Sequence, residues 1–229
     1  MHIPDGFIDA GTSAVVGALA VGGVALSVRR SSGTLDDRQV PMAGLAASFI
    51  FAAQMLNFPV AAGTSGHLLG AGLAAVLVGP AAGALCLTVV LIVQALLFAD
   101  GGLSALGLNV FNMAIVGVVA SAVIFRGLRA VLPRTRSSVV VASGIAAGLT
   151  PAIAALAFTA QYALGGNDAA SVGTVATAMV GVHLLIGIGE GVITALTVGA
   201  VLGVRPDLVA GASHLRSAIS VPVPVAVSA

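Results

Sequence analysis

The chain of 229 residues has very little charge for its length. Only 7% of its residues are charged, nine basic and eight acidic, whereas 59% are apolar and the mean hydropathy is +1.14. Soluble domains carry about 25% charged residues because their surface has to stay hydrated. The shortage of charge excludes a soluble enzyme, a nucleic-acid-binding protein and a disordered chain. It predicts an integral membrane protein.

Other residue types are also scarce. All nine basic residues are arginine, so no lysine-rich tail is present. The single cysteine, Cys86, cannot form an intrachain disulfide. Tryptophan is absent and only one tyrosine occurs, so the ends of the membrane helices have to be inferred from charges and turn residues. The 30 glycines suit helices that pack closely in lipid.

Apolar runs of membrane length predict an all-α protein with seven transmembrane helices, since one crossing needs about 20 apolar residues. The predicted helices cover residues 11–28, 41–57, 67–79, 82–99, 105–125, 138–163 and 176–203. We expect residues 1–204 to form one transmembrane domain. Residues 205–229 are expected to form a cytoplasmic tail.

The arginines fix the predicted orientation. They are Arg29, Arg30, Arg38, Arg126, Arg129, Arg134, Arg136, Arg205 and Arg216. With seven helices, all nine fall on one side of the membrane, which the positive-inside rule makes cytoplasmic. We therefore expect a multi-pass protein of the cell membrane with its N-terminus outside and its C-terminus in the cytoplasm.

Polar residues gather near the predicted outer ends of the helices. They are Gln54, Asn57, Gln94, Asp100, Asn109, Asn112, Gln161 and His183. Polar groups at membrane depth are costly and tend to mark sites, which favours a polar site that faces outward. Glu190 is the one carboxylate well inside an apolar run, and a helix-linking role is as reasonable for it as a direct one.

Small residues recur at every fourth position in two of the predicted helices. They are Ala10, Ala14, Ala18 and Gly22 in the first, and Gly187, Gly191, Ala195 and Gly199 in the last. This spacing lets helices approach closely. Internal packing is the primary expectation, and a docking face for another membrane subunit is the alternative.

The N-terminus offers a metal chelate. No signal peptide is evident, and the large His2 side chain should protect Met1 from removal, so a free α-amine is expected. The Met1 amine, the His2 amide nitrogen and His2 Nδ1 can bind one metal in fused rings if the amide loses its proton. A fourth nitrogen completes a square plane, as Ni²⁺ or Cu²⁺ prefers. His67, in the predicted outer loop, is the candidate for this fourth ligand. We therefore expect the domain 1–204 to be a transmembrane metal-capture domain that includes an N-terminal metal-binding segment.

Four segments resemble the CbiM/NikM family, the metal-binding membrane subunits of energy-coupling-factor transporters for cobalt and nickel. They are MHIPDGF at 1–7, GTSGHLLG at 63–70, FADGGLSALGLNVFNMA at 98–114 and HLLIGIGEG at 183–191. The resemblance implies that Ni²⁺ or Co²⁺ is the transported ligand, held by Met1, His2 and His67. It also implies supporting roles for Asn109, Asn112, His183 and Glu190, which would orient the ligands and balance charge.

The same resemblance implies partner proteins. These are a transmembrane coupling subunit, two cytoplasmic ATPases and, in many systems, a small accessory membrane subunit. The chain has no lysine and therefore no Walker A motif, so ATP hydrolysis is expected in the partners. The chain itself is expected to be a transporter subunit and not an enzyme.

Two rival interpretations come from other classes of protein. An intramembrane metalloenzyme would use His67, His183 and Glu190, but the sequence lacks H-E-x-x-H or a similar pairing. A capture subunit or carrier for a small organic solute, such as a vitamin, would leave the Met-His start without a role. The residues alone do not separate nickel from cobalt.

Overall fold

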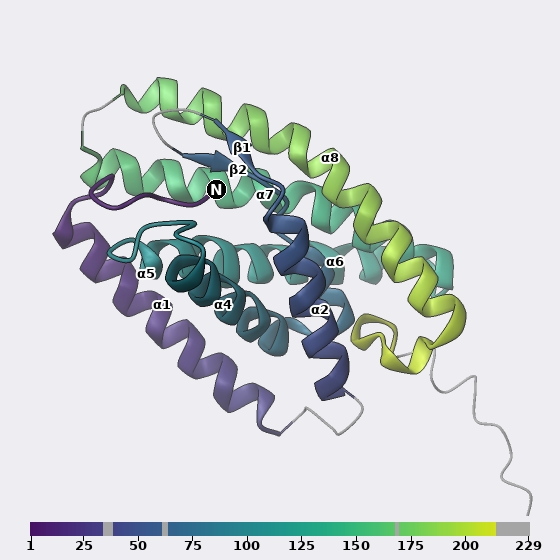
Figure 1. Ribbon diagram of the computed structural model, residues 1–229. Helices are drawn as coiled ribbons and strands as arrows, with labels where there is room; N and C mark the ends of the chain where they lie inside the picture. The colour runs from purple at the N-terminus through teal and green to yellow at the C-terminus, as the bar shows by residue number, and fades with distance from the viewer. Residues whose placement is uncertain (34–38, 61–63, 168–169, 214–229) are drawn as a thin grey trace, which may run out of the picture.

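The computed structural model describes residues 1–33, 39–60, 64–167 and 170–213, which form a mostly helical bundle. The helices are α1 (Ala10–Ser31), α2 (Gln39–Gln54), α3 (Ala71–Leu77), α4 (Pro80–Leu97), α5 (Leu106–Asn109), the π-helix η1 (Val110–Val116), α6 (Gly117–Val131), α7 (Arg136–Gly165), α8 (Val172–Val204) and the 3₁₀ turn η2 (Pro206–Leu208). A two-stranded antiparallel hairpin, β1 (Phe58–Pro59) and β2 (Ser65–Gly66), follows α2. Figure 1 shows the long helices side by side, with α1 and α8 on opposite edges.

Five helical segments are long and apolar enough to cross a membrane: α1, α4, the continuous run from α5 to α6, α7 and α8. Helix α2 is also apolar but has only 16 residues. Seven spanning helices were predicted, and five helices of full membrane length occur among the described residues. The described helix boundaries otherwise lie within a few residues of those expected, except at α5–α6, which extends to Val131.

The third predicted helix, over 67–79, is wrong in length. Helix α3 has seven residues, and at 1.5 Å per residue it is about 10 Å long, too short to span a bilayer. It begins late because Gly70 adopts a left-handed conformation, with φ of 75°. The apolar composition of 67–79 does not distinguish a helix from a loop, and residues 67–70 enter the bundle as a loop. All seven residues of α3 are buried.

The two stripes of small residues have different surroundings. In α8, a Cβ on Gly187 would lie in contact with the Gly148 carbonyl oxygen of α7, and a Cβ on Gly191 would lie 2.8 Å from the Gly144 oxygen. Internal packing is thus confirmed for this stripe. The α1 stripe, from Ala10 to Gly22, is exposed.

The described arginines share one end of the bundle. Helix α1 starts at the N-terminal segment and ends with Arg29 and Arg30. The C-terminal end of α7 lies beside the same N-terminal segment, because the Asp9 N–H donates to the Gly165 carbonyl at 2.7 Å. Helices α6 and α8 run toward the arginine-bearing end. After α8, the chain turns back as the yellow segment in Figure 1 and buries Val209. The rest of the expected tail, 214–229, lies outside the described residues.

Candidate metal site

The first three residues lie inside the bundle and are held there by main-chain contacts. Met1 and Ile3 are almost wholly buried, and Figure 1 shows the N-terminus beside β2. The Ile3 N–H donates to Asn109 Oδ1 at 2.8 Å, and Asn109 Nδ2 donates back to the Ile3 carbonyl at 3.3 Å. The Gly102 N–H also donates to that carbonyl, at 2.9 Å. Asn109 therefore fixes the register of the segment that carries His2.

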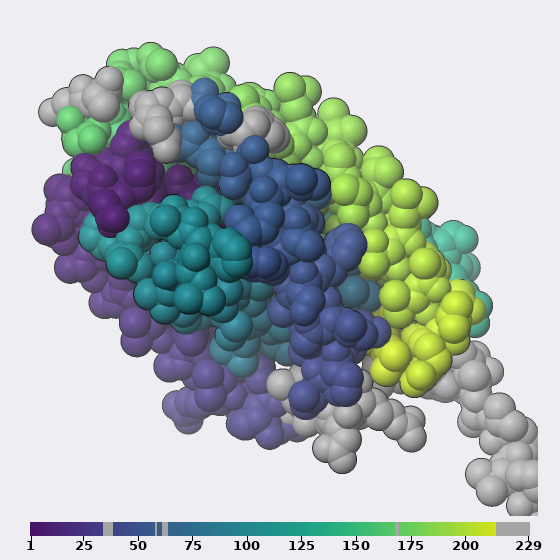
Figure 2. Space-filling view, viewed as in Figure 1, coloured from purple at the N-terminus to yellow at the C-terminus, as the bar shows by residue number. Residues whose placement is uncertain are grey.

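A loop after α4 supports this segment from one side. Asp5 Oδ1 accepts hydrogen bonds from the N–H of Ser104 at 2.7 Å and from its hydroxyl at 2.5 Å. These bonds hold the pKa of Asp5 below its usual value. Gly101 has φ of 90°, and a Cβ there would lie 3.0 Å from the His2 ring, so only glycine allows this approach. Figure 2 shows the purple start of the chain against this teal loop.

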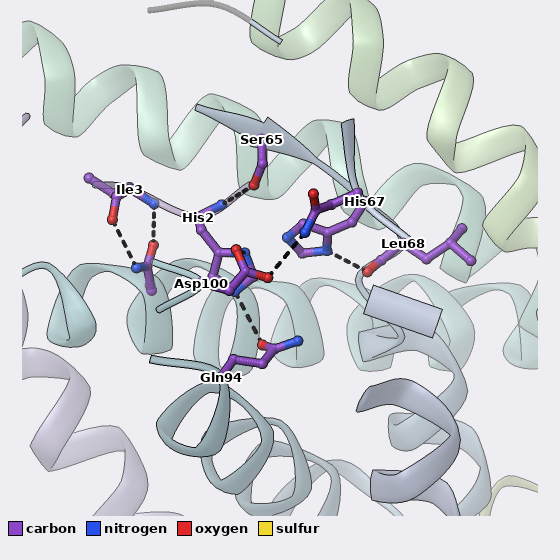
Figure 3. Close-up of polar contacts among 9 residues, drawn as sticks. His2, Ile3, Ser65, His67, Leu68, Gln94 and Asp100 are labelled. Atoms are coloured by element: carbon purple, nitrogen blue, oxygen red, sulfur yellow. Dashed lines mark hydrogen bonds and ion pairs between the residues drawn. The ribbon is translucent and has the colours of Figure 1, made fainter. Parts of the chain in front are cut away.

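His2 is surrounded by polar groups from three segments. Its Nδ1 lies 3.1 Å from Asp100 Oδ1, and its Nε2 lies 3.2 Å from Gln94 Oε1 (Figure 3). Its main-chain N–H points to the Ser65 hydroxyl oxygen in β2, at 3.4 Å. Only 4% of His2 is exposed. Each ring nitrogen therefore faces an oxygen that can accept a hydrogen bond or bind a cation.

His67 approaches His2 from the loop after β2. The two rings lie 4.5 Å apart, centroid to centroid, and are tilted by 30° (Figure 3). The His67 Nδ1–H donates to the Leu68 carbonyl at 2.8 Å, which leaves the lone pair on Nε2. This Nε2 is buried and has no hydrogen-bond partner among the described residues. An unpaired imidazole nitrogen beside the chain terminus is a ready ligand for a cation.

Glu190 positions the loop that carries His67. Its two carboxylate oxygens accept the N–H groups of Leu69, at 2.6 Å, and Gly70, at 3.0 Å. From α2, Gln54 Nε2 donates to the Leu69 carbonyl at 2.6 Å. Glu190 thus binds the main chain two and three residues after His67, at the start of α3, and its contacts are with the loop.

The remaining two predicted supporting residues lie farther from His2. Asn112, in η1, forms a reciprocal amide pair with Gln161 of α7, with distances of 2.9 and 2.7 Å. This pair links two helices. His183 is fully buried and donates from Nδ1 to the Met179 carbonyl at 2.7 Å, while its Nε2 has no partner in the described part of the chain.

Burial favours the uncharged form of the candidate ligand nitrogens. It lowers the pKa of the Met1 amine well below 8.0, even though the Asp100 charge opposes this shift. Burial also lowers the pKa values of His2 and, more strongly, His67. Burial disfavours ionisation of Asp100, but its other contacts, which include hydrogen bonds from His2 and Asn57, lower its pKa overall. The nitrogens are thus shifted toward their neutral forms beside one carboxylate.

Three polar neighbours of His2 were not among the predicted site residues: Ser65, Gln94 and Asp100. Asp100 and Gln94 stood out only as polar residues near the end of a run, and Ser65 only as part of a loop. No cluster of three or more His, Cys, Asp or Glu side chains suited to a metal occurs among the described residues. The predicted ligand set does not need one, because two of its nitrogens belong to the main chain.

The fold and the position of these residues define a multi-pass membrane protein with a buried polar site beside its N-terminus. The family described as cobalt uptake substrate-specific transmembrane region, CbiM, matches residues 2–208. The chain belongs to this family, which confirms the resemblance seen in the sequence.

Individual proteins show the same relationship. A putative metal transport protein of Haloquadratum walsbyi is 41% identical over 91% of this chain and 93% of its own length. A putative fused nickel transport protein of Archaeoglobus fulgidus is 37% identical over 91% of this chain and 68% of its own length. A crystal structure described as a truncated transition metal transporter superposes with a TM-score of 0.82, at 33% identity, and covers 89% of this chain and 99% of that one.

Proposed function

We propose that this chain is the substrate-binding membrane subunit of an energy-coupling-factor transporter that imports Ni²⁺ or Co²⁺. The ion is bound by the Met1 amine, the His2 amide nitrogen, His2 Nδ1 and His67 Nε2. Asn109 and Glu190 hold the two segments that carry these ligands, and Asn112 and His183 support the surrounding helices. Membership of the CbiM family and the names of its nickel transport relatives support this cargo.

The surroundings of the His2 ring are the observation that carries the proposal. A neutral imidazole has one N–H, yet in this structure both its nitrogens face an oxygen, Gln94 Oε1 and Asp100 Oδ1. With the Gln94 amide oxygen turned toward the ring, as the structure has it, the second contact needs either a second proton or another cation at Nδ1. Burial lowers the pKa of His2 and thereby disfavours the second proton. A metal ion at Nδ1, with the proton on Nε2 donated to Gln94, satisfies both contacts.

Charge balance favours the same arrangement. A divalent ion bound to a deprotonated amide has one remaining positive charge, and the ionised Asp100 carboxylate beside His2 neutralises it. A buried site with zero net charge avoids the large cost of an uncompensated charge in a low-dielectric interior. The amide nitrogen and neutral amine favour metals that accept planar nitrogen ligands.

The rival organic cargo fits the site less well. The cavity that adjoins His2 has a volume of about 270 Å³ and is lined by main chain and small polar residues. Pockets for drug-sized ligands have volumes of about 300–1,000 Å³ and mainly apolar linings. The described site therefore favours an ion over a vitamin-sized solute.

The proposed topology has the N-terminus outside and the C-terminus in the cytoplasm, with residues 1–204 as one transmembrane domain and 205–229 as a cytoplasmic tail. The chain crosses the membrane seven times. Loop 68–70 and α3 together make the third crossing, and α2 makes the second. The one-sided arginines support this orientation.

The proposed partners are a transmembrane coupling subunit, two cytoplasmic ATPases and a small accessory membrane subunit. The exposed small-residue stripe of α1 supports contact with another membrane helix, because close approach of helices requires small side chains. ATP hydrolysis takes place in the partners, and this chain binds and releases the ion.

The test is the metal content and visible spectrum of the purified protein. His67→Ala is expected to lose Ni²⁺ and Co²⁺ binding by at least about 100-fold, since one of four ligands is removed. His214→Ala, a histidine in the segment after α8, serves as the matched control and should retain both. Unchanged metal affinity in His67→Ala would refute the ligand set.

A second variant tests the amine. One glycine added before Met1 moves the α-amine away from His2 Nδ1, and planar coordination should be lost. Because Met1 is only 1% exposed, thermal unfolding of the metal-free protein has to show that the extended chain still folds. Retention of the native nickel spectrum by a folded, extended protein would contradict the amine ligand.

A further inference from the structure

A cavity of about 570 Å³ lies at the arginine-bearing end of the bundle, opposite the proposed metal site. Its walls come from α3, the turn between α3 and α4, the C-terminal half of α6, the loop before α7 and the segment that follows α8. None of the residues proposed for metal binding lines it.

Three arginines contribute to this cavity: Arg126 and Arg129 on α6, and Arg134 in the following loop. Arg129 Nη1 donates to the Pro133 carbonyl at 2.9 Å, which holds its side chain against the loop before α7. The charges of Arg129 and Arg134 are close enough to interact. No acidic residue is among those that line the cavity, and neither Arg126 nor Arg134 forms an ion pair with a described residue.

The rest of the cavity lining is mainly apolar. Phe125 and Val76 belong to it, and Gly211 packs against both, so closely that a Cβ on Gly211 would lie 2.9 Å from the Phe125 ring. Ala210, Gly211 and Ser213 of the segment after α8 also line it. The lining thus combines three arginines with apolar side chains at the ends of the membrane helices.

We propose that this cavity binds the phosphate group of an anionic phospholipid from the surrounding bilayer. Guanidinium groups bind phosphate oxygens through paired, charge-assisted hydrogen bonds. Basic pockets between membrane helices on the cytoplasmic side are suited to anionic headgroups. The apolar part of the lining accommodates the glycerol and first methylene groups, which a free phosphate ion would leave uncovered.

The binding test compares lipids of known charge. The full-length protein, in detergent, is mixed with equal amounts of phosphatidylglycerol and phosphatidylcholine, and bound lipids are counted by native mass spectrometry. The wild type should retain phosphatidylglycerol preferentially. Arg129→Gln and Arg126→Gln should each weaken this preference roughly fivefold, in line with one charge at a lipid surface. Retained nickel binding shows that the variants fold.

Arg136→Gln is the matched control, because Arg136 begins α7 close to Arg134 in sequence but does not line the cavity. It removes the same charge and should leave the lipid preference unchanged. An equal loss in Arg136→Gln would overturn the proposal, since net charge alone would then explain it. Inorganic phosphate is added in a third arm. Full displacement of the lipid by millimolar phosphate would assign the site to a free anion and overturn the lipid assignment.

Discussion

The two ends of the bundle use polar residues in opposite ways. At the N-terminal end, amides, imidazoles and carboxylates are buried and contact one another or the main chain, as Asn109, Gln161 and Glu190 do. At the other end, the described ion pair between Arg205 and Asp207 is exposed. Buried polar groups have to be paired or to bind a ligand, whereas exposed arginines are compatible with water and headgroups. The N-terminal end therefore holds a buried polar site, whereas the other end carries positive charges near its surface.

Among substitutions outside the proposed ligands, the largest expected effect comes from Glu190→Gln. Its amide group cannot accept both the Leu69 and Gly70 N–H groups, so one buried donor loses its partner, at a cost of about 1–3 kcal/mol. The loop that carries His67 should shift, and metal affinity should fall about 10–100-fold. Calorimetric titration with Ni²⁺ and thermal unfolding measure both effects. Unaltered affinity would show that Glu190 does not position His67.

The buried nitrogens of the N-terminal end should make the stability of the protein depend on pH. Burial lowers the pKa values of the Met1 amine, His2 and His67. The unfolded chain therefore binds more protons than the folded one, below pH 8.0 at the amine and below pH 6.5 at the imidazoles. Stability of the metal-free protein should therefore fall as pH falls from 8, by about 1.4 kcal/mol per pH unit for each proton. Melting curves from pH 8.5 to 5.5 test this. A melting temperature that rises on acidification would contradict it.

A smaller effect is expected for the amide pair between η1 and α7. In a double-mutant cycle with Asn112→Ala and Gln161→Ala, the coupling free energy should be about 0.6 kcal/mol and below about 1.7 kcal/mol, as for polar pairs in other membrane bundles. Unfolding in mixed micelles provides the measurement. Additive effects of the two substitutions would show that the pair does not connect these helices.

The smallest effect is expected at the opposite end. Asp207→Asn removes an ion pair whose side chains are 52% and 43% exposed, so water replaces the partner. The melting temperature and the metal affinity should both remain unchanged. A loss of metal affinity comparable to that of Glu190→Gln would remove the contrast between the two ends.

Part of the fold was predictable because membrane helices are recognisable by their apolar length. The predicted runs 138–163 and 176–203 correspond to α7 and α8, and 82–99 corresponds to α4. The run at 67–79 was wrong because apolar composition does not distinguish a spanning helix from a loop followed by a short buried helix. The loop ends at Gly70, which has a left-handed conformation. Its N–H donates to Glu190, 120 residues further along the chain, and a contact over that distance is not visible in the local sequence.

The predicted site residues show the same division. The sequence could offer the Met-His start and His67 as candidate ligands because their chemistry depends on residue type and position, and the structure places the rings of His2 and His67 4.5 Å apart. Asn109 was identified only as a polar residue at a helix end, and its pairing with Ile3 depends on tertiary structure. Asp100 and Gln94 were missed as neighbours of His2, because a carboxylate and an amide after an apolar run are also typical of ordinary helix ends.

The sequence by itself determined that this protein lies in the membrane, that its described arginines fall at one end of the bundle, and that its first residues carry the nitrogen atoms of the proposed chelate. These properties follow from composition, from the order of charges along the chain and from covalent structure. Only the tertiary structure decided which oxygens face the His2 ring, how Glu190 holds the His67 loop and where the arginines enclose a cavity. Those contacts join residues about 60 to 120 positions apart, and their geometry depends on how the helices pack.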